Sequence, residues 1–414
     1  MSLEPDDRPK LRNIEPISVI VNGRQAIGLK DPLHLRDEIV CVSKEMLPIL
    51  AMLDGRHSLR DIQVALTRQT GRFVFIDDLV SALARLEEAC LLEGEGFRGA
   101  YASKVAEYRQ GPCRVSSHAG ISYSADPEGL RAELAGYFTQ DGGPGFPDFA
   151  SDVRRPVGLI APHIDLRAGG RCFAQGYHAL AAGQPSDVYV ILGTGHAGVE
   201  GIFAATTLDF ETPLGIVETD REFLAELSAE LGRDPAAEEI LHATEHVIEF
   251  QVVFLQYLFS ARHQFTIVPI LCSLSHHLFG GDPAFAGARE TFDSFCRALK
   301  ACCDRSARSV CFIASADLDH IGPRYGDRFV PHQGTISEAL RNDTELLSTL
   351  ERCDVNAFVR GVAQENDERR ICGFSPITTM LHTMDATEGQ VLALDFATVD
   401  DKNSFVSFTS MIFH

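Results

Sequence analysis

Four short apolar runs in the C-terminal part of the chain constrain its fold more than any other feature. They are VGLIAPH at 157–163, DVYVILGTG at 187–195, FTIVPILC at 265–272 and SVCFIASAD at 309–317. Continuous β-branched or apolar runs of this length are typical of central strands that are buried on both faces. Helix-like segments lie between them, at 170–182, 220–231 and 286–304. The alternation predicts an α/β fold with a central, mostly parallel or mixed sheet flanked by helices.

The N-terminal part has a different pattern, which predicts a small helical domain with an edge hairpin. Residues 15–30 read as two short strands around a turn at Asn22-Gly23. Three helix-like segments follow, at 44–53, 58–68 and 76–89, and Ser58 is the predicted N-cap of the second. The phrase LPILAMLDGRHSLRDIQVAL resembles the PqqD-like and winged-helix domains.

These two patterns divide the chain into three segments. We expect a PqqD-like or winged-helix-like module over residues 1–98 and an α/β domain over 113–414. Residues 99–112 between them, which include Gly99, Gly111 and Pro112, are of mixed polarity and read as a linker.

Charge and composition narrow the classes of partner. The formal net charge is -21; residues 1–110 carry 15 basic and 17 acidic side chains, a net of -2, which leaves -19 for the remainder. An acidic surface of this kind repels phosphate backbones, so we expect no nucleic-acid partner and favour small molecules, peptides or proteins. No apolar run reaches the roughly 20 residues that span a bilayer, and the charged N-terminus does not resemble a secretory signal, so cytoplasmic residence is expected.

Histidines follow the ends of three of the four predicted strands. His163 ends the first run, His196 follows the glycine-rich end of the second, and Asp317 and His320 follow the fourth. In open α/β sheets, ligands bind at the carboxyl ends of the strands, where these side chains would converge. Neutral imidazole is both a metal ligand and a near-neutral base, so the pattern indicates a metal or an acid/base site.

The chain resembles the Memo family, also called protein B of the AmmeMemoRadiSam system. Seven elements occur in the family's order and cover most of residues 113–414. They are SSHAGISYS (116–124), IAPHIDLRAGG (160–170), VILGTGHAG (190–198), TEHVIEFQVVFLQ (244–256), FTIVPILC (265–272), ASADLDHIGPRYG (314–326) and ICGFSPI (371–377).

The resemblance implies a fold similar to that of the class III extradiol dioxygenases, which are non-haem iron enzymes. It places the metal ligands on His163, His196 and Cys372, in a mononuclear site for which Fe(II) is expected first and Cu or Zn are alternatives. It also makes His320 and Asp317 the catalytic candidates, with His320 as general acid/base. The residues that it places around the pocket are His118, Asp165, His246, Gly195 and Gly373.

Two departures from the family pattern affect this site. Asp165 stands where many relatives have glycine, so it either accepts a hydrogen bond from His163 or caps the following helix. Gly195-His196-Ala197 stands where relatives often have two adjacent histidines, which removes one donor from the pocket.

Two other functions remain open. His242, Glu245 and His246 satisfy H-x-x-E-H, a zinc-peptidase pattern that requires its histidines on one helical face. Alternatively, the chain is a non-enzymatic scaffold whose pocket captures a peptide and whose N-terminal module presents a protein partner. A redox or dioxygenase-like reaction at the metal is what the analogy of fold implies.

Overall fold

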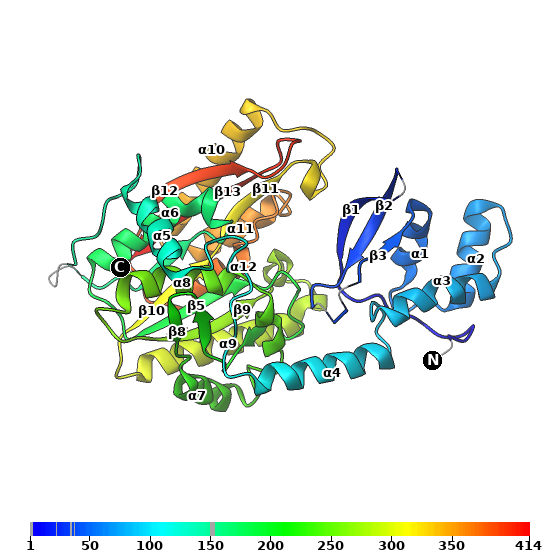
Figure 1. Ribbon diagram of the computed structural model, residues 1–414, viewed down its shortest axis with the longest axis horizontal. Coiled ribbons are helices and arrows are strands. Elements are labelled where there is room, and N and C mark those ends of the chain that lie inside the picture. Colours follow the sequence, from blue (N-terminus) through cyan, green and yellow to red (C-terminus); the bar gives the residue numbers. More distant parts are fainter. Residues whose placement is uncertain (1–2, 22, 34, 37, 150–153) are drawn as a thin grey trace. The chain divides into compact units, whose positions relative to one another are not determined.

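A computed structural model describes residues 3–21, 23–33, 35–36, 38–149 and 154–414 of the chain. These residues form two compact units, Met1–Gly111 and Pro112–His414 (Figure 1). Asn22 of the predicted turn lies outside the described residues. Each unit has its own hydrophobic core and is described by itself.

The first unit contains a three-stranded antiparallel sheet and four α-helices among its described residues. The strands are β1 (Glu15–Val21), β2 (Arg24–Lys30) and β3 (Val40–Val42), in the order β1-β2-β3. The α-helices are α1 (Leu47–Met52), α2 (Leu59–Thr70), α3 (Ile76–Glu88) and α4 (Glu95–Gln110), and a short 3-10 turn, η1 (Lys44–Met46), precedes α1. The hairpin and the three predicted helical segments are present in the predicted order.

Helix α2 shows how the local sequence defines the boundaries of an element. The Ser58 side chain accepts the backbone N–H of Asp61, and the Asp61 carboxylate accepts that of Ser58 in return. Gly71 ends the helix in the left-handed conformation with φ 67°, where glycine avoids the steric penalty of a side chain. Leu59 and Ile62 of this helix are completely buried in the core of the unit.

The segment expected to be a linker is largely helical. Helix α4 covers most of residues 99–112, and none of its residues is fully buried. Gly99 of the predicted linker, like Gly96 just before it, costs about 1 kcal/mol relative to alanine inside a helix. Both glycines lie near the start of the helix, and good helix formers such as Lys104, Glu107 and Arg109 follow them.

The second unit is built on a mixed sheet. Its described strands pair in the order β11-β13-β4-β10-β5-β9-β6, and β12 pairs with β13. The strands are β4 (Gly158–Ala161), β5 (Val188–Thr194), β6 (Phe203–Ala205), β9 (Thr266–Cys272), β10 (Val310–Ser315), β11 (Asp317–Ile321), β12 (Gly389–Thr398) and β13 (Phe405–Phe413). A separate two-stranded ribbon contains β7 (Phe210–Thr212) and β8 (Gly215–Val217).

The four apolar runs form the parallel centre of this sheet. Strand β10 pairs in parallel with β4 and β5, and β5 pairs in parallel with β9. Every residue of β4 is buried, as the continuous apolar pattern predicted. The carboxyl ends of β4, β5 and β10 therefore lie at one edge of the sheet, each followed by a loop that carries polar side chains.

Helices cover both faces of the sheet. On one face α6 (Leu166–Ala182) packs on β4, β12 and β13, while α8 (Val247–Phe259) packs on β5 and β10 and α5 (Pro127–Thr139) packs on both helices. On the other face the core is formed with helices α7 (Arg221–Leu231), α9 (Ala286–Arg305), α10 (Gln333–Glu351), α11 (Val355–Gln364) and α12 (Phe374–Thr383). Short 3-10 turns occur at η2 (Glu239–Ala243), η3 (His276–Phe279), η4 (Pro283–Phe285) and η5 (Pro323–Tyr325). The result is a mixed α/β unit with its sheet buried between helices.

Candidate metal centre

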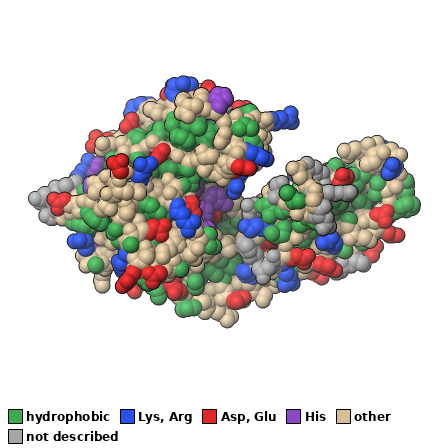
Figure 2. Space-filling view, turned by 45° about the horizontal axis from the view of Figure 1, so that its top comes forward, with side chains coloured by type: hydrophobic (Ala, Val, Ile, Leu, Met, Phe, Trp, Pro, Cys, Tyr) green, Lys and Arg blue, Asp and Glu red, His purple; other side chains and the backbone are tan. Residues whose placement is uncertain are grey.

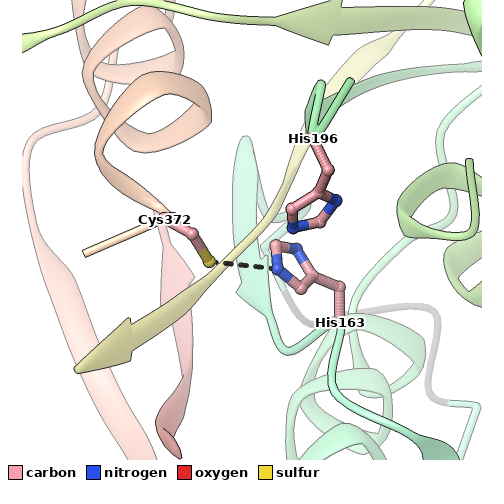
Figure 3. A group of neighbouring side chains, drawn as sticks. All are labelled: His163, His196 and Cys372. Atoms are coloured by element: carbon pink, nitrogen blue, oxygen red, sulfur yellow. Dashed lines mark hydrogen bonds between the residues drawn. The ribbon is translucent and has the colours of Figure 1, made fainter. Parts of the chain in front are cut away.

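His163, His196 and Cys372 come together where β4 and β5 end and α12 begins (Figure 3). One potential ligand atom from each side chain lies within 4.8 Å of the other two. His163 Nε2 is 3.1 Å from Cys372 Sγ, although the two residues are 209 positions apart in the chain. The fold, rather than a local sequence motif, brings these three donors together.

His163 is buried and is held by hydrogen bonds from both its backbone and its ring. Its side chain is 3% exposed, and its backbone N–H donates to Asp317 Oδ1 at 2.9 Å. Its Nδ1 lies 3.0 Å from the carbonyl oxygen of Ser315, which can only accept a hydrogen bond. Nδ1 therefore carries a proton, and Nε2 is the ring atom turned toward Cys372.

His196 is held in the same way by a buried carboxylate. Its backbone N–H donates to Glu245 Oε2 at 3.0 Å, and its Nδ1–H donates to Oε1 at 3.1 Å. Glu245 also accepts the backbone N–H of His246 at 3.0 Å, and its Oε1 lies 3.2 Å from His246 Nδ1. Burial raises the pKa of Glu245, but His196 and His246 together lower it well below its usual value. This role of Glu245 was not predicted from the sequence, where the residue appears only in the peptidase motif.

Cys372 is poised to be a thiolate. Burial raises the pKa of its thiol, but the neighbouring His163 and His320 and hydrogen bonds from His163 and His196 lower it well below 9. Cys372 thereby raises the pKa of His163 to about 9, against the opposing effect of burial. The thiol and the imidazole therefore each favour the charged form of the other.

Gly373 allows the cysteine to approach the sheet. Its backbone N–H donates to the carbonyl of Asp317 at 2.9 Å, and a Cβ atom at this position would lie 2.6 Å from the same oxygen. Thr194 adds a second tether, because its hydroxyl donates to the Cys372 carbonyl at 2.8 Å. Two imidazoles and a thiolate form a donor set that fits a transition-metal ion. A bound ion would replace the proton that lies between His163 Nε2 and Cys372 Sγ.

The two catalytic candidates lie next to this cluster. Asp317 is buried, accepts the His163 backbone N–H, and has its Oδ2 3.7 Å from His163 Nε2. His320 donates Nδ1–H to the Leu318 carbonyl at 2.9 Å and packs edge-on against Tyr325. Burial lowers the pKa of His320, but Cys372 and Asp317 raise it above its usual value. Asp317 therefore supports His163, while His320 faces the thiolate.

Of the predicted pocket-lining residues, the two histidines lie beside the cluster and Asp165 does not bond to it. The His246 ring is 5.4 Å from His196 and 5.8 Å from His163, and the His118 ring is 5.0 Å from His246, between ring centroids. Asp165 is the N-cap of α6 and accepts the Arg167 N–H at 2.9 Å. Of the two roles considered for Asp165, the structure shows the helix cap. Gly195 has no room for a side chain, because a Cβ atom there would lie 2.7 Å from Val199.

A buried ion pair behind the site has no counterpart in the sequence analysis. Glu249 of α8 is completely buried and pairs with the equally buried Arg114. Its carboxylate also accepts the Tyr123 hydroxyl and the backbone N–H groups of Ser117 (2.9 Å) and His118 (3.0 Å). A glutamate within the mostly apolar, buried sequence VIEFQVVFLQYLF requires a buried partner, which is the signal that points to this network.

The helical face required by the zinc-peptidase motif does not form. His242 ends up in the 3-10 turn η2, whereas His246 is the N-cap of α8. Arg114 donates hydrogen bonds to the carbonyl oxygens of His242 and Glu245, at 2.9 and 2.7 Å. These carbonyls are therefore not paired within one continuous helix. His242 donates Nε2–H to the Ala204 carbonyl, and burial lowers the pKa of its ring to about 4. The expectation that His242 and His246 share one helical face is wrong.

None of the helices described in the structure has the length and apolar character needed to traverse a lipid bilayer.

Known proteins with similar sequences include several from bacteria and archaea. A MEMO1 family protein of Aquifex aeolicus is 25% identical over 412 residues, which covers 98% of this chain and 100% of that protein. One from Methanopyrus kandleri is 30% identical over 311 residues, covering 72% of this chain and 98% of its own. One from Methanococcoides burtonii is 32% identical over 268 residues, covering 65% and 86%.

These alignments differ in how much of the chain they include. The A. aeolicus protein matches nearly the whole chain, so its match extends into the first unit. The M. kandleri protein is matched almost completely by 72% of this chain, and the remainder has no counterpart in it. A family model for Memo-like proteins matches residues 114–412, which is nearly all of the second unit. Because this match spans more than half of the sequence, the chain belongs to the Memo-like family.

Proposed function

We propose that the second unit is a metal-binding domain that holds one transition-metal ion on His163, His196 and Cys372. The observation that carries the proposal is the convergence of three donor atoms within 4.8 Å from segments far apart in the chain. The hydrogen bonds from Nδ1 to Ser315 and Glu245 support it, because they turn the Nε2 atoms of both rings toward the thiol.

The donor set accepts Fe(II), Cu or Zn, and among these ions we place Fe(II) first. Imidazole is a suitable ligand for all three ions. A thiolate is a soft ligand that binds Cu and Zn well and also forms bonds to iron. We place Fe(II) first because of the resemblance to the class III extradiol dioxygenases, which rests on fold analogy. Bound iron or copper would supply redox chemistry that the side chains lack.

The surrounding residues have separate tasks in this proposal. Asp317 and Glu245 fix the orientation of His163 and His196 through backbone and side-chain hydrogen bonds. His320 faces the site with its Nδ1 proton committed to Leu318, so its Nε2 is the atom that would give or take a proton. A dioxygenase-like or other oxygen-dependent oxidoreductase reaction on a small molecule or peptide is the activity that this arrangement supports.

Metal analysis of purified protein tests the proposal. We expect about one equivalent of metal in the wild type and a large loss in Cys372→Ser and His163→Ala. Cys303→Ser is the matched control, because Cys303 is a half-buried thiol on α9, away from the site. Unchanged metal content in both site variants would refute the ligand assignment.

Oxygen uptake distinguishes an enzyme from a binding protein. If the metal is bound as proposed and uptake with catechols and thiols stays at background, the non-enzymatic peptide-binding function gains support. A zinc peptidase would instead lose zinc in His246→Ala and keep it in Cys372→Ser. We assign the first unit, by its PqqD-like resemblance, to docking a protein partner, which a pull-down with residues 1–111 deleted would test.

A further inference from the structure

Two histidines beside the cluster, His118 and His246, are not among the proposed ligands of the first ion. His246 Nδ1 lies 3.2 Å from Glu245 Oε1, and this carboxylate, which already accepts two backbone N–H groups, is the acceptor toward the ring. The proton is therefore on Nδ1, and the lone pair is on Nε2. Within the described part of the chain, His246 Nε2 makes no hydrogen bond.

His118 also carries its proton on Nδ1, as its hydrogen bond with Ser117 indicates. Its Nδ1 is 2.9 Å from Ser117 Oγ, whose own proton is donated to Glu249 Oε2 at 3.1 Å. Ser117 Oγ also accepts a hydrogen bond from Arg114 at 2.9 Å, so it acts as an acceptor toward its other neighbours. His118 must then donate from Nδ1, which leaves its Nε2 as a lone pair. This atom too has no hydrogen-bond partner among the described residues.

The spacing of the two rings suits a shared ion. Their centroids are 5.0 Å apart and their planes are inclined by 45°. Two imidazoles that bind one tetrahedral ion at about 2 Å through nitrogen have centroids about 5 Å apart. Phe250 packs against both rings, at 5.7 Å from His118 and 5.0 Å from His246, and provides an apolar support.

The pair is open to solvent, as ion entry requires. The His246 side chain is 27% exposed, and His118 is half-buried. Figure 2 shows that some histidine side chains, coloured purple, reach the surface of the molecule. His163 and His246 centroids are 5.8 Å apart, so an ion on this pair would be a near neighbour of the proposed first ion.

The other nearby group of potential ligands, formed by His196, Glu245 and His246, is better explained without an ion. Its atoms are close enough for coordination. However, both Nδ1 atoms already donate to the carboxylate, and Glu245 also accepts two backbone N–H groups. Glu245 is thus saturated with donors, and its effect is to leave the Nε2 atoms of both rings available.

We propose that His118 and His246 bind a second divalent ion of the late first-row type, such as Co(II), Zn(II) or Cu(II), through their Nε2 atoms. The proposal rests on the proposed function in one respect, that a first ion is bound nearby on His163, His196 and Cys372. With two protein ligands and solvent, the second position binds more weakly than the first. Two ions side by side favour a small molecule that offers two oxygen donors.

Titration with Co(II) as the probe tests the second position. The wild type should bind two equivalents: a tight one with a thiolate-to-cobalt absorption band and a weaker one without it. His118→Asn and His246→Asn should each abolish the weaker equivalent and keep the band, because the asparagine amide retains a donor near the Nδ1 position. Only one equivalent in the wild type, or two in both variants, would overturn the proposal.

A control addresses adventitious binding to surface histidines. His276 and His277 form another pair, with centroids 4.1 Å apart, and His277 is exposed. His277→Ala should leave both equivalents in place, and loss of the weaker one there would refute the assignment to His118 and His246. Cys372→Ser should remove the band; if the band persists, the proposed function fails while the second position is still judged by the asparagine variants.

A crystallographic measurement covers the case in which a variant fails to fold. Wild-type crystals with bound Co(II) should show an anomalous peak between the Nε2 atoms of His118 and His246, separate from a peak at Cys372. A single peak at Cys372 would overturn the second position.

Discussion

At the scale of single residues, the site depends on which atom of each histidine carries the proton. His163 and His196 are fixed by different acceptors, a main-chain carbonyl and a buried carboxylate. Glu245 also restrains His246, so one carboxylate orients two rings. The sequence identified the histidines by their positions after strands, but the identity of each acceptor depends on the folded structure.

Glu245→Gln tests this orientation. The amide cannot accept hydrogen bonds at both of its atoms, so one histidine loses its acceptor and its preferred tautomer. We expect the dissociation constant of the first ion to rise about 10- to 100-fold, as for other residues that support metal ligands. Competition with a chromophoric chelator measures the change. Glu338→Gln, at an exposed glutamate of α10, should leave it unaltered.

At the scale of elements, helix α8 and the segment before α5 are joined by the Arg114–Glu249 pair. Both side chains are fully buried, and Arg114 also binds the carbonyls of His242 and Glu245. The pair therefore determines where α8 begins and, through Ser117 and Glu249, where His118 is held.

Arg114→Met should be strongly destabilising. The variant leaves the Glu249 carboxylate buried without its cation, which costs about 3–5 kcal/mol of unfolding free energy. Urea denaturation of the second unit measures this loss. In the matched control, Arg289→Met removes a part-exposed pair with Asp293 on α9 and should cost less than about 1 kcal/mol. Equal effects of the two substitutions would contradict the importance of the buried pair.

The same pair predicts a pH dependence. Burial raises the pKa of Glu249, but Arg114 and the hydrogen bonds lower it below its ordinary value of 4.5. Its contribution to stability is therefore complete above about pH 4.5 and is lost as the pH falls through the lowered pKa. Between pH 7 and pH 3 the wild type should lose more unfolding free energy than Glu249→Gln. Parallel losses in the two proteins would show that Glu249 does not titrate as described.

The sequence predicted the centre of the sheet better than its margins. Strands β4, β5, β9 and β10 have continuous apolar sequences, which identify buried parallel strands directly. β13 also consists entirely of buried residues, but it contains Ser407, Thr409 and Ser410, and their hydroxyls obscure the pattern. The pairing of Arg114 with Glu249 spans 135 positions and has no periodicity in the sequence.

At the scale of the whole molecule, the residues of both proposed metal positions lie in the second unit, within Pro112–His414. The first unit has its own core of buried leucine, isoleucine and valine side chains. The relative from M. kandleri aligns over 98% of its own length with 72% of this chain, so this family member has no counterpart of the remaining part.

A chain that begins at Pro112 should therefore keep the metal site. We expect it to fold cooperatively and to bind the same amount of metal as the full chain, because the site residues and their hydrogen-bond partners are all retained. Circular dichroism and metal analysis of the two proteins measure this. Loss of metal from a well-folded second unit would show that the first unit contributes to the site.

The position of β13 has a consequence for how the protein is made. This strand pairs with β12 along one edge and with β4 and β11 along the other, and Gly158 of β4 is matched with Phe413, about 250 residues later. At roughly 5–20 residues per second of synthesis, β13 is made on the order of ten seconds or more after β4. An apolar strand with an unpaired edge is prone to aggregate during this interval, so we expect the nascent chain to depend on chaperones until β13 emerges from the ribosome.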